Sequence, residues 1–120
     1  MRESTLWVLH FIAGAVIVVA LGIHFGIMHL DHLLFSLGIG DKDVLSYASV
    51  FQRSKLIFHL GVYLVLLAAA LYHGLYGFRS LVLELPLGQT LEKAVSVVTL
   101  LGGLALFTYG AHAIIIGYTL

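Results

Sequence analysis

The chain has 120 residues, of which 61% are hydrophobic and 10% are charged, and six basic residues balance six acidic ones. Soluble domains carry about 25% charged residues, so this composition excludes a soluble fold and indicates a protein that faces lipid. The charges form short clusters instead of a basic stripe, which excludes a nucleic-acid surface, and the absence of cysteine excludes disulfides, thiolate catalysis and a cysteine-ligated iron–sulfur cluster on this chain.

The first predicted element is a transmembrane helix over approximately residues 5–31. Between Glu3 and Asp31 lie 27 uncharged residues, more than the roughly 20 that a helix needs to cross a bilayer. The preceding segment, MREST, enters this run without a small-residue cleavage site, so we expect a retained anchor and not a signal peptide.

Two further spans are predicted, over approximately residues 54–83 and 90–119. Between Lys55 and Arg79 lie 23 uncharged residues, and 27 follow Lys93. These runs are too long and too little alternating for barrel strands, and a helix satisfies its own backbone hydrogen bonds in hydrocarbon. The sequence therefore predicts an all-α membrane protein with one transmembrane domain, residues 1–120, built of three helices.

Polar residues mark the connections between these spans. The first connection is expected to hold a short interfacial helix around residues 45–51, and the second contains the only proline, Pro86, in a membrane-surface turn. The positive-inside rule leaves the orientation undecided, because three basic residues fall on each side. On one side these are Arg2, Arg79 and Lys93, and on the other Lys42, Arg53 and Lys55.

Seven histidines in so apolar a chain are its most informative feature, since polar side chains at membrane depth are costly and mark function. His10 and His24 are fourteen residues apart on the first span, and so are His59 and His73 on the second. Fourteen residues span roughly 21 Å and return to within about 40° of the same helix face. Because consecutive spans are antiparallel, His10 is expected at the depth of His73, and His24 at the depth of His59 and His112.

Two histidine layers in a helical bundle are typical of haem ligation, since neutral imidazole is a good axial ligand, and they leave room for one or two haems. Each histidine has a plainer interpretation as well. His59 and His112 can serve as hydrogen bonds between helices, and His29 and His32 flank Asp31 at the surface. A proton or metal pathway would favour carboxylates at membrane depth, and the uncharged runs at the centre of the predicted spans contain none.

One stretch, LYHGLYGFRSLVLEL at residues 71–85, resembles the second transmembrane helix of the cytochrome b anchors of succinate dehydrogenase and fumarate reductase. The elements shared with these anchors are His73, Gly77, Arg79 and Glu84. The spacing also suits their chemistry, because Arg79 lies about 9 Å along the axis from His73, within reach of a haem propionate. Snorkelling of Arg79 to the headgroups is a compatible alternative.

Two further stretches are similar to the small hydrophobic anchor of actinobacterial and archaeal-type succinate dehydrogenases. They are LGIHFGIMHLDH, residues 21–32, and WVLHFIAG, residues 7–14. In the second stretch Phe11 and Ala13 stand where the family has arginine and serine, which removes groups expected near quinone in the larger anchor. The departure favours the smaller of the two anchors.

The resemblance implies a role for each matched residue. His73 would be a haem axial ligand, with His24 the ligand of a second, distal haem if one is present. Arg79 would bind a propionate and His10 would lie in the haem vicinity. Gly77 would let the haem, or a neighbouring helix, pack closely, and Glu84 would either shape a quinone site or cap the exposed turn. Other candidates for the distal ligand are His29, His59 and His112.

The resemblance also implies an assembly. The chain would pair with a second membrane-anchor subunit in a heterodimeric helical bundle that holds haem b and contributes to quinone reduction, with a flavoprotein and an iron–sulfur subunit supplying electrons. It would lie in a prokaryotic plasma membrane with its N-terminus on the cytoplasmic side, in a complex able to form a higher oligomer. Alternatives are a haem-free structural anchor and a small histidine-lined transporter.

Overall fold

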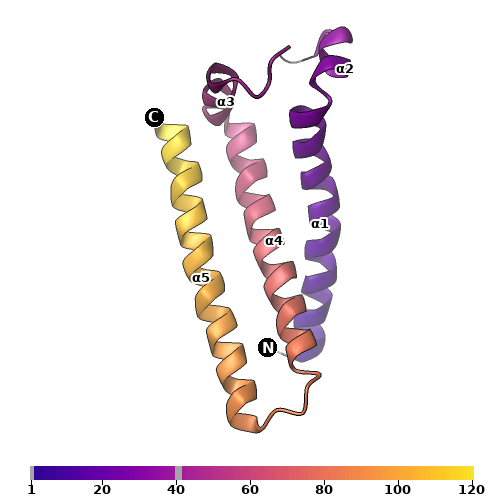
Figure 1. Cartoon of the computed structure of the whole chain (residues 1–120), viewed down its shortest axis with the longest axis vertical. Helices are drawn as coiled ribbons and strands as arrows, with labels where there is room; N and C mark the ends of the chain where they lie inside the picture. Colours follow the sequence, from indigo (N-terminus) through magenta and orange to yellow (C-terminus); the bar gives the residue numbers. More distant parts are fainter. Residues whose placement is uncertain (1, 40–41) are drawn as a thin grey trace.

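The computed structural model describes residues 2–39 and 42–120, which form three long helices with two short ones at one end (Figure 1). The long helices are α1 (Glu3–His29), α4 (Ile57–Val82) and α5 (Gln89–Thr119), and the short ones are α2 (Asp31–Ser36) and α3 (Tyr47–Ser54). Neither described range contains a strand. Each long helix is long and apolar enough to cross a membrane, so the predicted all-α membrane fold is confirmed.

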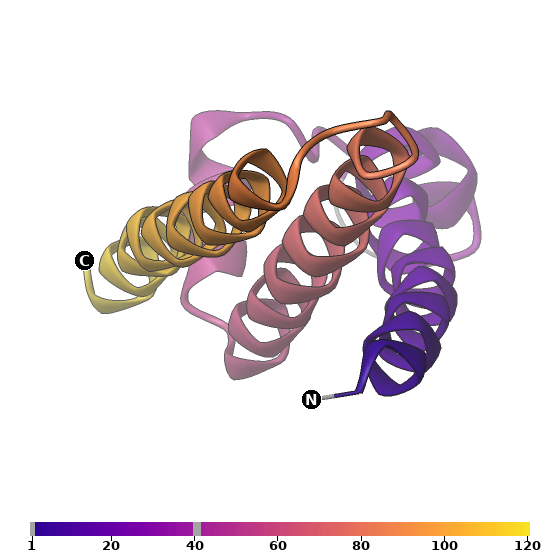
Figure 2. The ribbon, with the colours of Figure 1, turned by 90° about the horizontal axis from the view of Figure 1, so that it is seen from below.

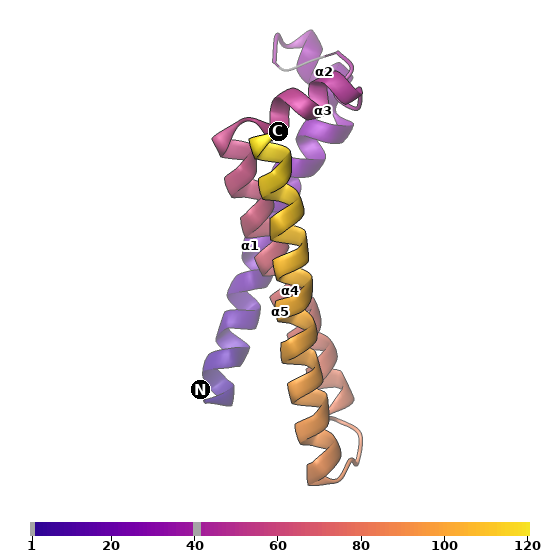
Figure 3. The ribbon, with the colours of Figure 1, turned by 90° about the vertical axis from the view of Figure 1, so that its left-hand side faces the viewer.

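The three long helices run up, down and up, with α4 in the middle (Figures 1 and 2). Helix α4 packs against both α1 and α5, whereas the backbones of α1 and α5 do not meet within the described residues. The N-terminus lies at the same end as the α4–α5 connection, and the C-terminus lies beside α3 at the other end (Figure 3). The bundle is 57 Å long, and α4 is the element through which a site can draw on both neighbours.

Local sequence signals explain where the elements begin and end. The Ser46 hydroxyl accepts a hydrogen bond from the Ser49 amide at 3.2 Å, which caps the start of α3. This helix lies slightly later than the interfacial helix expected around residues 45–51. Helix α2 ends at Ser36, and Gly38 follows with φ +77°, a backbone conformation that favours glycine. Pro86 cannot continue a helix and lies in the turn after α4.

Few side chains are buried within the chain itself. The contact between α1 and α4 is built on small residues, with Ala13 and Ala20 on α1 and Ala69 on α4 buried. Helix α5, which is described throughout, has no buried residue, and most large apolar side chains are exposed. Such surfaces suit a protein surrounded by lipid and other membrane helices.

Candidate functional site

The histidine pair nearest the N-terminal end forms the centre of the candidate site. The His10 and His73 rings stack with centroids 4.0 Å apart and planes inclined by 2°. His73 Nδ1 lies 2.9 Å from the backbone carbonyl oxygen of His10. Because a carbonyl oxygen can only accept, Nδ1 carries the proton, and the lone pair of the neutral His73 ring lies on Nε2. The structure therefore brings together the two histidines that were expected at one depth.

A glycine faces each ring of this pair. A Cβ built on Gly14 would lie 3.0 Å from His73 Cε1, and one built on Gly77 would lie 3.1 Å from His10 Cε1. Each helix thus presents a glycine to the histidine of the other, which lets α1 and α4 approach closely. Gly77 was expected to let a haem or a neighbouring helix approach closely, and in this structure it gives room to the imidazole of His10 on α1.

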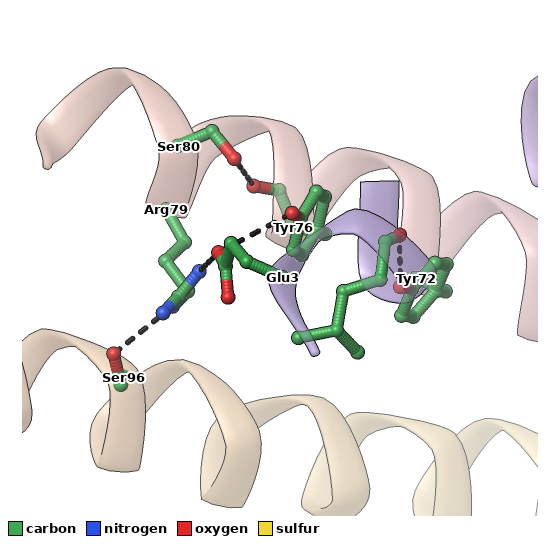
Figure 4. Close-up of polar contacts among 7 residues, drawn as sticks. Glu3, Tyr72, Tyr76, Arg79, Ser80 and Ser96 are labelled. Carbon is green, nitrogen blue, oxygen red and sulfur yellow. Dashed lines mark hydrogen bonds and ion pairs between the residues drawn. The ribbon is translucent and has the colours of Figure 1, made fainter. Parts of the chain in front are cut away.

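A second hydrogen bond from an α4 side chain to the α1 backbone lies one helical turn from the bond between His73 and the His10 carbonyl. The Tyr72 hydroxyl donates to the carbonyl oxygen of Leu6 at 2.7 Å (Figure 4). Tyr72 and His73 are consecutive on α4, and their acceptors, Leu6 and His10, are four residues apart on α1. Together the two bonds fix both the rotation and the depth of α4 relative to α1.

Arg79 joins all three long helices at this end of the bundle (Figure 4). Its Nη1 donates to the Glu3 carboxylate of α1 at 2.8 Å, and its Nε donates to the Ser96 hydroxyl of α5 at 2.9 Å. The Tyr76 hydroxyl donates to the same Glu3 oxygen at 3.4 Å, and the guanidinium lies 5.8 Å from the centre of the Tyr76 ring. The bond to Ser96 therefore orients the Arg79 guanidinium, which binds a carboxylate through Nη1.

The sequence reasoning missed Glu3, Tyr76 and Ser96 as members of this cluster. The opposite charges of Glu3 and Arg79 were an available signal. Glu3 begins the first span and Arg79 lies near the end of the second, and these positions share one depth in an antiparallel pair. Tyr76 and Ser96 carry no comparable signal, since their participation depends on the rotation of each helix about its own axis.

A groove of about 540 Å³ runs between α4 and α5 beside this cluster. Its walls are mostly apolar, with Leu75, Leu100 and Phe107 among the lining residues, and Arg79 and Ser96 also line it. The groove can accept an elongated apolar molecule that carries hydrogen-bonding groups at one end.

The second histidine layer is looser than the first. His24 and His59 each pack edge-on against Tyr63, with ring centroids 5.8 and 6.0 Å away. His59 is only 9% exposed, neither of its ring nitrogens has a hydrogen-bond partner in the described structure, and His24 Nδ1 is likewise buried without one. His112 lies instead on an exposed face of α5 beside Tyr109.

The remaining candidates lie at the surface. His29 is exposed and packs against Phe25 with ring centroids 4.9 Å apart, and His32 is exposed on α2. Glu84 is exposed in the turn that follows α4. Among the described residues no group of three or more histidine, cysteine, aspartate or glutamate side chains could hold a bare metal ion. A haem differs in this respect, because the protein supplies only its axial ligands.

Comparison with known proteins gives one informative match. No family model matches the chain, and no solved structure matches it either. The chain is 28% identical over 110 residues to the succinate dehydrogenase hydrophobic membrane anchor subunit of Archaeoglobus fulgidus, which covers 92% of this chain and 86% of that protein. The resemblance identified from the sequence is therefore confirmed, and the chain is related over most of its length to a membrane anchor of succinate dehydrogenase.

Proposed function

We propose that this chain is a membrane-anchor subunit of a succinate:quinone oxidoreductase, in which it pairs with a second anchor subunit to hold haem b. The relationship to the Archaeoglobus fulgidus anchor and the three membrane-spanning helices support the anchoring role. The chain would be a non-catalytic subunit, and a flavoprotein and an iron–sulfur subunit would deliver electrons to it. Its N-terminus would lie on the cytoplasmic side of a prokaryotic plasma membrane.

The observation that carries the haem proposal is the bond between His73 Nδ1 and the His10 carbonyl oxygen, at 2.9 Å. Histidines that bind metals commonly donate their other ring nitrogen to a carbonyl or carboxylate, which selects the tautomer and orients the ring. His73 has this arrangement, and its Nε2 keeps the lone pair that an axial ligand must donate. The second axial ligand would come from the partner anchor.

Two other features of the site fit a haem. Arg79 already binds a carboxylate, that of Glu3, at 2.8 Å, so its surroundings suit a propionate. His10 stacks on His73, so both the ring and the carbonyl of His10 orient the proposed ligand. When bound, haem b supplies one-electron redox chemistry through its iron, while the chain holds the imidazole and pairs with the propionate charge.

We also propose a second, distal haem ligand and a quinone contact. His24 is the candidate ligand if a second haem is present. It packs on Tyr63, which lies in the first turns of α4, whereas His73 lies in the last turns of that helix. The apolar groove between α4 and α5, with Arg79 and Ser96 among its lining residues, supports a contribution to quinone binding. Glu84 lies just beyond the end of α4, five residues after Arg79, and it is the candidate for a contact with the quinone headgroup.

The proposal is tested by replacing His73 with leucine in the assembled complex and recording the visible absorption spectrum with a pyridine haemochrome assay. We expect loss or a strong shift of the low-spin haem bands, because one axial ligand is removed. His32→Leu is the matched control, since His32 is exposed on α2. Copurification of the flavoprotein and iron–sulfur polypeptides with both variants would show that the complex still assembles. An unchanged spectrum in assembled His73→Leu complex contradicts the assignment.

The structure also favours a second candidate, a haem-free structural anchor. The stacked rings of His10 and His73 already tie α1 to α4 without a cofactor, and so does the hydrogen bond from the His73 ring to the His10 carbonyl oxygen. In that case the purified wild-type complex would contain no haem by the same assay, yet would still copurify with the flavoprotein and iron–sulfur subunits.

A further inference from the structure

The two partners of the Glu3–Arg79 ion pair are held very differently. The Arg79 side chain is 20% exposed and is anchored by the Ser96 hydroxyl at 2.9 Å, which does not depend on Glu3. The Glu3 side chain is 63% exposed, and Arg79 Nη1 and the more distant Tyr76 hydroxyl are its hydrogen-bond donors in the described structure. The Arg79 guanidinium is thus held independently of Glu3, whereas the Glu3 carboxylate is exposed and is held mainly by Arg79.

The position of Glu3 in its helix makes its release inexpensive. Glu3 is the first residue of α1, and the residue before it, Arg2, has an extended backbone and no side-chain cap bond. Terminal turns of helices fray readily, because their first amides have no acceptor within the helix. The carboxylate can therefore leave Arg79 while the Tyr72 bond to Leu6 and the His73 bond to His10 hold the rest of α1 in place.

We propose that Glu3 is an exchangeable carboxylate that occupies Arg79 until the carboxylate of a ligand replaces it. This inference rests on the proposed function, in which that ligand carboxylate is a haem propionate. Exchange replaces one charge-assisted hydrogen bond by another, so Arg79 remains paired in both states and no cation is left uncompensated at the membrane boundary. Because the ligand must displace Glu3, the free energy of the Glu3–Arg79 ion pair is subtracted from that of ligand binding, and the affinity falls accordingly.

The size of the effect follows from the exposure of the pair. Exposed ion pairs are weak, and their usual strength corresponds to an affinity change of roughly 1.5- to 5-fold. Removing the Glu3 charge should therefore tighten haem binding within this range. If Arg79 instead bound both carboxylates at once through its several donors, removal of Glu3 would leave the affinity unchanged or weaken it.

The test titrates the full chain in detergent micelles with haemin and with haemin dimethyl ester, which lacks the free propionates. We expect Glu3→Gln to bind haemin roughly 1.5- to 5-fold more tightly than wild type and to bind the ester with wild-type affinity. In an Arg79→Gln background, Glu3→Gln should have no effect on haemin. Glu92→Gln is the matched control, because Glu92 is an exposed carboxylate near the start of α5 at the same end of the bundle.

Each outcome separates this inference from the proposed function. Equal or weaker haemin binding by Glu3→Gln overturns the exchange, and so does an equal gain with the ester, which would indicate a general loosening of α1. A wild-type chain that binds neither compound, alone or with its partner anchor, contradicts haem binding itself. Circular dichroism of each variant verifies that the helices are intact.

Discussion

Replacing Gly14 with alanine should place a methyl group against the ring of His73. The added Cβ would lie 3.0 Å from His73 Cε1 and 3.2 Å from Nδ1. Favourable carbon contacts begin at about 3.5 Å, so the ring or the helix must move by about 0.5 Å. The His73 ring has little freedom to move, because its Nδ1 is hydrogen-bonded to the His10 carbonyl oxygen at 2.9 Å and the His10 ring stacks against it.

The expected cost combines two opposing contributions. Overpacking of a tight contact destabilises a fold by about 1 to 3 kcal/mol. Alanine favours a helix over glycine by about 0.5 to 1 kcal/mol. Gly22→Ala is the matched control on the same helix, because a Cβ at Gly22 has no atom within 4 Å and gains only the helix preference. The difference in unfolding free energy between the two variants should therefore be about 1 to 3 kcal/mol, with Gly14→Ala the less stable.

The assay is reversible unfolding of each variant in mixed detergent micelles, followed by helix content. A second readout is the low-spin haem spectrum of the assembled complex, which should shift in Gly14→Ala and not in Gly22→Ala, because only the former tilts the His73 ring. Equal stability of the two variants would refute the tight contact between α1 and α4. Unequal stability with identical spectra would show that the contact is structural and that His73 does not bind the haem.

Two further changes probe the polar groups between α1 and α4. Tyr72→Phe removes the 2.7 Å bond to the Leu6 carbonyl, and we expect a loss of about 0.5 to 1.5 kcal/mol in the same unfolding assay; no loss would mean that water or lipid replaces the bond. His59→Leu removes a buried imidazole that has no hydrogen-bond partner, so it should stabilise the isolated chain by about 1 kcal/mol or more, and a destabilised variant would reveal a bound water or ligand at this ring.

The fold was largely predictable because the bilayer imposes one strong constraint. Each uncharged run between clusters of charge had to form a helix that satisfies its own backbone, and the structure confirms three such spans. The charge of Asp31 marked the expected end of the first helix, whereas the short helix α2 (Asp31–Ser36) was not predicted, because residues 31–36 were assigned to the connection.

The candidate site was only partly predictable. Spacing and antiparallel packing were enough to bring His10 and His73 to one depth, and they meet in the structure. Their stacking and the bond to the His10 carbonyl depend on rotamers and helix rotation, which the spacing does not specify. The same limit applies to His112, which lies late in α5 as expected but on an exposed face of that helix. The ligand roles themselves stay predictions.

Helix α5 is longer than the two other spans, with 31 residues against 27 in α1 and 26 in α4. At 1.5 Å per residue it measures about 46 Å, well beyond a hydrocarbon thickness of about 30 Å. Glu92 and Lys93 in its early turns must stay among the headgroups. The Arg79 bond to Ser96 near its start, at 2.9 Å, and the Ser54 bond to the Gly117 carbonyl oxygen near its end, also at 2.9 Å, hold α5 against its neighbours. Its excess length must therefore be accommodated by a tilt of the helices together or by early turns of α5 that extend beyond the hydrocarbon, and not by movement of α5 alone.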